Sequence, residues 1–217
     1  MDSFFKKNIA VAGAILLVVV AYIGNYLPLQ KSMAFIDSNR SFGQITDLNK
    51  ILELMARPLD LPSPIGQQEL VRNTSNLIYN LVRSDNGKNP AITKALTDFV
   101  NKYYIPTLAK NRGLSFDQDL YILGLMNEGA AIQTRDGRYA DAAQGYFERG
   151  LTLSPRRPQF LYGLFDVFRM KGDLPSAQKT GEKILSFWPA DPKIKGLMDQ
   201  INHVLSASAT ASSTLKR

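Results

Sequence analysis

Two segments in the C-terminal half of the chain resemble each other at a fixed distance. Residues 142–155, AAQGYFERGLTLSP, align with residues 176–189, SAQKTGEKILSFWP. Five positions are identical at an offset of 34 residues: Ala143 and Ala177, Gln144 and Gln178, Glu148 and Glu182, Leu151 and Leu185, Pro155 and Pro189. A constant period of this length is typical of chains built from tandem copies of one small unit. The alternative is two unrelated amphipathic hairpins.

Several residues of the two copies have properties expected of a pair of packed helices. They are Gly137, Ala143 and Pro155 in the first copy and Gly172, Ala177 and Pro189 in the second. The small alanines allow two helices to approach closely, and the prolines end the second helix of each unit. The glycines stand where the first helix must end, because glycine accepts the left-handed conformation of a helix C-cap. They are 35 residues apart, so we expect one extra residue near the turn of the first copy.

The period and these positions resemble the tetratricopeptide repeat, a helix-turn-helix unit that stacks into a solenoid. The resemblance covers residues 116–189, although the segment DLYILGLMNEGAAIQT fits the first helix of a unit poorly. A closing helix follows, with Ile194, Leu197, Met198 and Ile201 on its apolar face. Two units cannot bury a solenoid core, so we expect this helix and those before residue 110 to cap the ends.

The resemblance also implies a binding groove, because the first helices of such units line a concave face that holds an extended peptide or a partner helix. The residues that would face this groove are Glu128, Ile132, Arg135, Gln159, Tyr162, Asp166 and Arg169. Each of them is equally compatible with an ordinary exposed helix position. Family members that bind chaperone C-terminal carboxylates use Lys and Asn where Tyr162 and Asp166 stand, so that ligand is not expected here.

The N-terminal part of the chain predicts a membrane segment. Residues 8–29, NIAVAGAILLVVVAYIGNYLPL, carry no charge. About 20 apolar residues span a bilayer core, and Tyr22 and Tyr26 lie near the end, where interfacial aromatic residues are common. We expect an uncleaved transmembrane helix. A cleaved signal peptide is the alternative, with SMA at residues 32–34 as its cleavage site.

The charges around this segment predict its orientation. Lys6 and Lys7 precede the apolar run, whereas Lys31 and then Arg40 follow it. The positive-inside rule favours the side with the denser positive charge as the cytoplasmic one. Residues 1–7 are therefore expected in the cytoplasm and the C-terminal domain outside it.

The remaining sequence predicts an all-α chain. Residues 30–115 contain three amphipathic helical patterns, which we expect to pack on the solenoid formed by residues 116–205. The first pattern is predicted to stop at RPLDLPSP, which begins at Arg57, and Pro106 is predicted to kink or end the third. No period-2 alternation argues for a sheet. The small polar residues 206–217 predict a disordered tail.

Composition restricts the functional classes. The chain has a net charge of +7, but residues 116–205 hold 11 acidic and 11 basic residues, so nucleic-acid binding is not expected. The chain has no cysteine and a single histidine, His203, so neither a metal site nor a Ser-His-Asp relay is expected. No phosphate-binding glycine motif occurs. We therefore expect no enzyme and no cofactor, but a protein that binds a protein partner.

The layout of the whole chain carries a second resemblance. A membrane helix followed by GNYLPLQKSMAFIDS precedes a helical region with IGQQELVRNTSNLI and repeats ending in LTLSPRRPQF. This order is similar to the C-terminal tail of bacterial O-antigen ligase/polymerase-like membrane proteins that carry such repeats. The resemblance implies an accessory or split part of a surface-polysaccharide assembly complex, without glycosyl transfer of its own.

Overall fold

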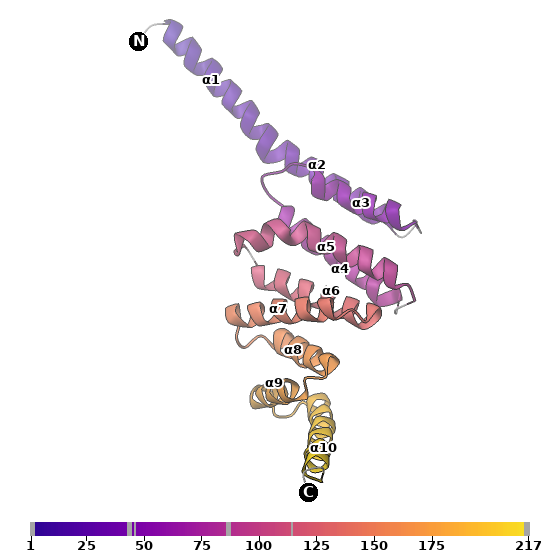
Figure 1. Ribbon diagram of the computed structural model, residues 1–217. Helices are drawn as coiled ribbons and strands as arrows, with labels where there is room; N and C mark the ends of the chain where they lie inside the picture. Colours follow the sequence, from indigo (N-terminus) through magenta and orange to yellow (C-terminus); the bar gives the residue numbers. More distant parts are fainter. Residues whose placement is uncertain (1–2, 43–44, 46, 86–87, 114, 215–217) are drawn as a thin grey trace. The chain divides into compact units, whose positions relative to one another are not determined.

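The computed structural model describes residues 3–42, 45, 47–85, 88–113 and 115–214, and in this part of the chain it contains helices and no strand (Figure 1). The predicted all-α fold class is confirmed at this level. The elements are α1 (Ser3–Ala21), a π-helical turn η1 (Tyr22–Tyr26), α2 (Leu27–Phe42), α3 (Leu48–Asp60), α4 (Gln67–Asp85), α5 (Pro90–Lys110), α6 (Phe116–Thr134), α7 (Gly137–Leu153), α8 (Pro158–Lys171), α9 (Leu174–Phe187) and α10 (Pro192–Thr214).

Contacts divide the chain into two compact units. The first comprises Met1–Leu77 with Lys102–Pro106, and the second comprises Ile78–Asn101 with Thr107–Arg217. The division runs through α4 and α5. Part of the reason is Gln133 of α6, whose amide donates to the carbonyl of Val82 in α4 at 2.7 Å and whose oxygen accepts from Thr93 in α5.

The first unit begins with a long apolar helix. α1, η1 and α2 follow one another without a break, and the stretch from Lys7 to Phe42 is long and apolar enough to cross a membrane. Its most apolar window is entirely unburied; Leu17, for example, is 71% exposed. The predicted segment, residues 8–29, lies inside this stretch. A signal sequence would have the same appearance.

In the remainder of the first unit, side-chain hydrogen bonds link segments that are distant in the sequence. α2 packs against α3, and the ammonium group of Lys31 is buried where it donates to the carbonyl of Leu61 at 2.6 Å and to Gln67. Tyr103 donates from its hydroxyl to the carboxylate of Asp60 at 2.8 Å. These bonds link segments that are 30 or more residues apart in the sequence.

Two prolines lie inside helices. The first pattern stops within RPLDLPSP, as predicted, but only after Pro58, and α5 does not end at Pro106. α3 continues through Pro58 to Asp60, and α5 continues through Pro106 to Lys110. A proline within a helix lacks the N–H that would bond to the carbonyl four residues earlier, which for Pro58 is Leu54. The buried hydroxyl of Ser38 donates to this carbonyl at 2.8 Å. The bond that proline removes is therefore replaced by one from α2.

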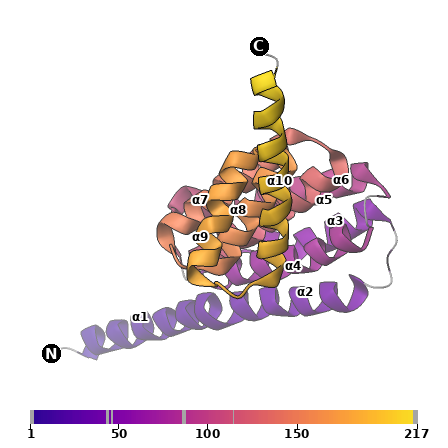
Figure 2. The same cartoon turned by 90° about the horizontal axis from the view of Figure 1, so that it is seen from below.

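In the second unit each helix from α6 to α9 contacts the next one in sequence, and α6 also contacts α8; Figure 2 shows α9 and α10 side by side. Phe147 of α7 is fully buried. A Cβ atom added at Gly124 of α6 would lie 2.2 Å from its ring, and one added at Gly163 of α8 would lie 2.5 Å from it. The two glycines thus make room for one aromatic side chain. Ala143, on the same face of α7, is also fully buried, as is Ala177 of α9.

The turns of the two repeated segments differ more than the sequence suggested. Gly172 caps α8 with φ 73°, but Arg135 rather than Gly137 takes the left-handed conformation at the end of α6, with φ 56°. Gly137 is instead the first residue of α7. The N-caps of α7 and α9, both aspartates, are 37 residues apart, whereas their C-caps, which precede Pro155 and Pro189, are 34 apart. α7 therefore gains almost a full turn at its start, not one residue.

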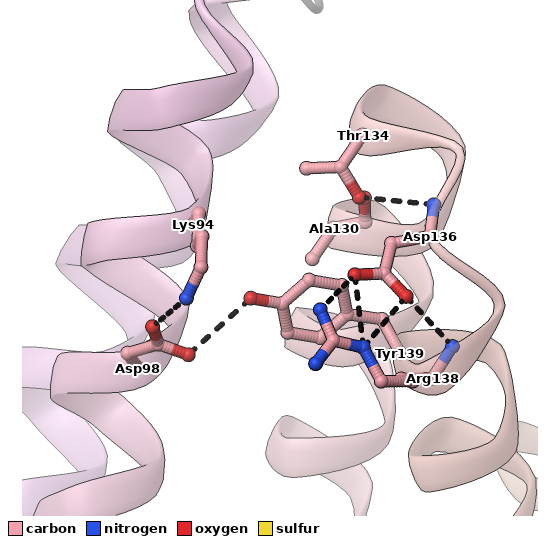
Figure 3. Close-up of polar contacts among 7 residues, drawn as sticks. All are labelled: Lys94, Asp98, Ala130, Thr134, Asp136, Arg138 and Tyr139. Atoms are coloured by element: carbon pink, nitrogen blue, oxygen red, sulfur yellow. Dashed lines mark hydrogen bonds and ion pairs between the residues drawn. The ribbon is translucent and has the colours of Figure 1, made fainter.

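Local hydrogen bonds at this turn explain the early start of α7 (Figure 3). The carboxylate of Asp136 accepts from the backbone N–H of Arg138 at 3.0 Å and pairs with its guanidinium at 2.6 Å. The hydroxyl of Thr134 donates to the carbonyl of Ala130 at 2.7 Å and accepts from the N–H of Asp136. Both termini at the turn are thereby capped without glycine.

The C-terminal helix also extends further than composition indicated. α10 continues to Thr214, so residues 206–214 of the predicted disordered tail are helical. Residues 215–217 lie outside the described part of the chain. The alanines of this stretch have high helix propensity and allow α10 to continue beyond its apolar face.

Candidate functional site

A groove in the second unit brings together polar and aromatic side chains from four helices. Two adjoining cavities, of about 480 and 700 Å³, share Tyr79, Gly129, Ile132, Asp166 and Lys193 and so form one depression, which we call the α6–α8 groove. The groove is also lined by Arg83, Tyr121, Leu125, Glu128, Arg135, Gln159 and Tyr162. Within α4, only Tyr79 and residues that follow it line the groove.

The structure brings most of the predicted groove residues together. Five of them line the smaller cavity: Glu128, Ile132, Gln159, Tyr162 and Asp166. Arg135 lines the larger cavity. Arg169 lies over the ring of Phe165, with 5.6 Å from its guanidinium carbon to the ring centroid, and pairs with Asp166 at 3.0 Å. Ile132 is 62% exposed, which is a high value for a large apolar side chain on a groove wall.

Sequence reasoning missed the contributions of α4 and α10. Tyr79 and Arg83 belong to a helix that we expected only to cap the end of the solenoid. The repeat spacing could have predicted Lys193 as a groove residue, because Leu125, Gln159 and Lys193 follow one another at intervals of 34 residues. All three of these equivalent positions line the groove.

Glu128 is an acid of the groove whose pKa is raised. Burial of its carboxyl group raises its pKa to about 7, the negative charge of Asp166 acts in the same direction, and Lys193 opposes both. Desolvation disfavours a charged carboxylate, so this group is close to half protonated at neutral pH. A carboxyl group in this state can donate a hydrogen bond as well as accept one.

Tyr162 is oriented by a partner at the start of α10. Its hydroxyl donates to the carboxylate of Asp191, whose other oxygen caps α10 by accepting from the N–H of Ile194 at 3.0 Å. Burial, then the bond to Asp191, raises the pKa of Tyr162 to about 12. Trp188 lies beside the ring, with 6.2 Å between the two ring centroids. The hydroxyl is thus engaged, and the ring is what Tyr162 contributes to the groove wall.

The end of α6 and the start of α7, on either side of Arg135, are anchored to neighbouring helices. Besides the bonds of Gln133, the hydroxyl of Tyr139 donates to Asp98 of α5 at 3.3 Å, and Lys94 pairs with the same carboxylate at 2.6 Å (Figure 3). Arg135 itself has no ion-pair partner among the described residues and is exposed.

The arrangement is suited to holding a polar, extended ligand by stacking, hydrogen bonding and charge. Over the part of the chain that the structure describes, no group of three or more His, Cys, Asp or Glu residues is placed to hold a metal ion. No protein-family model, curated protein or solved structure matches this chain. The resemblances drawn above therefore depend on its own residues and geometry.

Proposed function

We propose that this protein is a membrane-anchored scaffold of the tetratricopeptide type that binds a segment of a protein partner in its α6–α8 groove on the extracytoplasmic side. The observation that carries the proposal is the groove itself. It is continuous across α4, α6, α8 and α10, and it presents tyrosine rings, an exposed isoleucine and ionisable groups to one depression. Grooves of this kind accept extended peptides or amphipathic helices.

The repeat spacing supports the solenoid part of the proposal. α8 begins at Pro158 and α10 at Pro192, an interval of 34 residues. Leu125, Gln159 and Lys193 stand at the same interval and line the groove from three successive helices. This is expected if α6, α8 and α10 are the first helices of successive units, because equivalent residues of a solenoid share one face.

The N-terminal helix supports the membrane part. It is long and apolar enough to span a bilayer, and the side chains of its most apolar window are unburied. The lysine pair before it favours a cytoplasmic N-terminus. A phosphatase reporter fused after Arg217, active only outside the cytoplasm, tests this orientation. An inactive but fully expressed fusion would contradict it.

The order of the elements supports a second proposal, an accessory or split tail of a surface-glycan assembly protein. A membrane-length helix followed by helical pairs is the layout on which that resemblance depends. Co-purification with a glycan polymerase or ligase, and glycosyltransferase genes beside its own, would favour this second proposal over a general scaffold.

Photo-crosslinking in the native membrane tests groove binding. Benzoylphenylalanine replaces Gln159 in the groove or Lys183 on α9, both of which are exposed. We expect a discrete crosslinked protein from position 159 and none from position 183. Crosslinks from both positions alike, or from position 183 alone, would contradict the proposal, and so would their absence at position 159.

A further inference from the structure

The cations of the α6–α8 groove outnumber its free anions. Arg83, Arg135 and Lys193 line the larger cavity, all three are exposed, and none forms an ion pair with a described residue. Of the two acids, Asp166 is already paired with Arg169 at 3.0 Å. The groove therefore has an excess of unpaired positive charge, although residues 116–205 as a whole are neutral.

Glu128 is the remaining acid, and it is only partly accessible. No described residue forms a hydrogen bond or an ion pair with its carboxyl group. The charged and titratable groups that act on it or line the same groove are Asp166 and Tyr162 of α8, Lys193 of α10, Tyr121 of α6, Tyr79 and Arg83 of α4, and Arg135 at the end of α6. The chain's only histidine, His203, does not line either cavity.

We propose that the α6–α8 groove binds an acidic segment of its protein partner, whose carboxylates pair with Arg83, Arg135 and Lys193, and that Glu128 must be protonated for tight binding. This inference rests on the proposed function and adds the chemistry of the ligand. Charge complementarity is the reason for proposing an acidic segment instead of a basic one. A basic segment would meet three unpaired cations and a single carboxyl group that is close to half neutral at pH 7.

The role of Glu128 follows from its neighbours. A ligand carboxylate beside Lys193 brings a second negative charge near Glu128, which favours the neutral form further. The protonated group then donates a hydrogen bond to the ligand, whereas the ionised group would repel it. Binding is therefore coupled to proton uptake, and affinity rises as the pH falls.

A peptide selection identifies the preferred chemistry without knowledge of the partner. The full chain in non-ionic detergent micelles is immobilised at about pH 6, where peptide carboxylates remain ionised, and a phage library of random short peptides is selected on it. We expect the enriched peptides to carry an excess of Asp and Glu. The best of them is then labelled, and its affinity is measured by fluorescence anisotropy.

Three matched substitutions test the cations. Arg83→Gln, Arg135→Gln and Lys193→Gln should each weaken the selected peptide about two- to fivefold at low salt, the range for one exposed ion pair, and less at high salt. Lys179→Gln removes an equally exposed charge from α9, away from the groove, and should leave the affinity unchanged. An equal loss in Lys179→Gln would contradict a specific role for the groove cations.

The pH dependence tests Glu128. The protonated fraction of a group with a pKa of about 7 falls about tenfold between about pH 6 and pH 8, so the affinity should fall by up to the same factor. Glu128→Gln, which imitates the neutral acid, should bind equally well at both pH values. If this variant retains the wild-type pH dependence, Glu128 is not the controlling group.

The outcomes separate this inference from the proposed function. Enrichment of neutral or basic peptides that still require the groove would overturn the acidic ligand and leave groove binding intact. No enrichment above that on empty micelles would overturn both. Acidic peptides whose affinity is insensitive to all three groove substitutions would show that they bind elsewhere on the chain.

Discussion

Gly150 tests the packing of α7 against α8 most directly. Gly150 is buried, and a Cβ atom added to it would lie 2.2, 2.4 and 2.6 Å from three atoms of the Phe160 ring, where ordinary contacts are 3.4–4 Å. The ring has little freedom to move, because Tyr121 lies edge-on at 6.1 Å, Phe147 at 6.5 Å and Arg157 at 5.4 Å from it. Gly150→Ala therefore forces the two helices apart.

Two opposing effects set the magnitude. Overpacking of a filled core costs about 1–3 kcal/mol, whereas replacing glycine by alanine within a helix contributes about 0.5–1 kcal/mol of stability. We expect Gly150→Ala to lower the free energy of unfolding by about 1–2 kcal/mol, since overpacking is the larger effect. Gly145→Ala is the matched control. It lies on the exposed face of the same helix with no atom within 4 Å of the added Cβ, and it should gain the helix contribution alone.

Urea unfolding in detergent micelles measures both changes through the fluorescence of Trp188, the only tryptophan, which packs beside Tyr162 and Phe187. Phe160→Leu should relieve the clash, so Gly150→Ala should be much less destabilising in the Phe160→Leu background than in the wild type. For residues in contact, we expect a coupling free energy of about 1 kcal/mol or more between the two substitutions. Close packing of Gly150 against Phe160 would be contradicted by a Gly150→Ala variant as stable as Gly145→Ala, or by a double mutant without coupling.

Three further predictions concern other parts of the chain. Ser38→Ala should lower stability by about 1–3 kcal/mol, because it leaves the half-buried carbonyl of Leu54 without a donor. Pro58→Ala restores a backbone N–H and should recover part of that loss in a thermal melt followed by circular dichroism. Ala143→Leu should be destabilising by about 1–3 kcal/mol or more through overpacking, so an unchanged melting temperature would contradict the close helix contact. Glu128 has a folded-state pKa raised from 4.5 to about 7, so the folded state holds the extra proton and stability should fall as pH rises through this window, by up to about 3 kcal/mol. Glu128→Gln should remove that fall from urea titrations, and a pH dependence equal to wild type would contradict the assignment.

The departures from sequence-based expectation share a physical cause. The sequence predicts that the first amphipathic helix stops at RPLDLPSP and that Pro106 kinks or ends its helix, because the missing N–H is a local property of proline. The loss of this N–H is tolerated when another group donates to the carbonyl that it leaves free. For Pro58 that carbonyl belongs to Leu54, and the donor is Ser38, 20 positions before the proline. Likewise the turn after α6 does not need Gly137, since Thr134 and Asp136 cap it and Arg135 takes the left-handed conformation.

The candidate site was partly predictable for a related reason. The repeat offset relates the expected groove positions of the second copy to those of the first, and five of the seven line one cavity. Tyr79 and Arg83 could not be found in this way, because α4 precedes the repeated segments. The raised pKa of Glu128 was also beyond sequence reasoning, since burial and the position of Asp166 are properties of the packed helices.

The sequence by itself determined the helical class, the apolar N-terminal helix and the 34-residue interval that recurs between α8 and α10, because apolar periodicity and terminal composition act along the chain. Only the tertiary structure decided where the helices end and which charges share the groove. Both depend on groups far apart in the sequence, namely the donor that replaces a lost backbone bond and the helix that lies opposite an ionisable side chain. Ser38 beside Leu54, and Lys193 beside Glu128, are the two clearest cases.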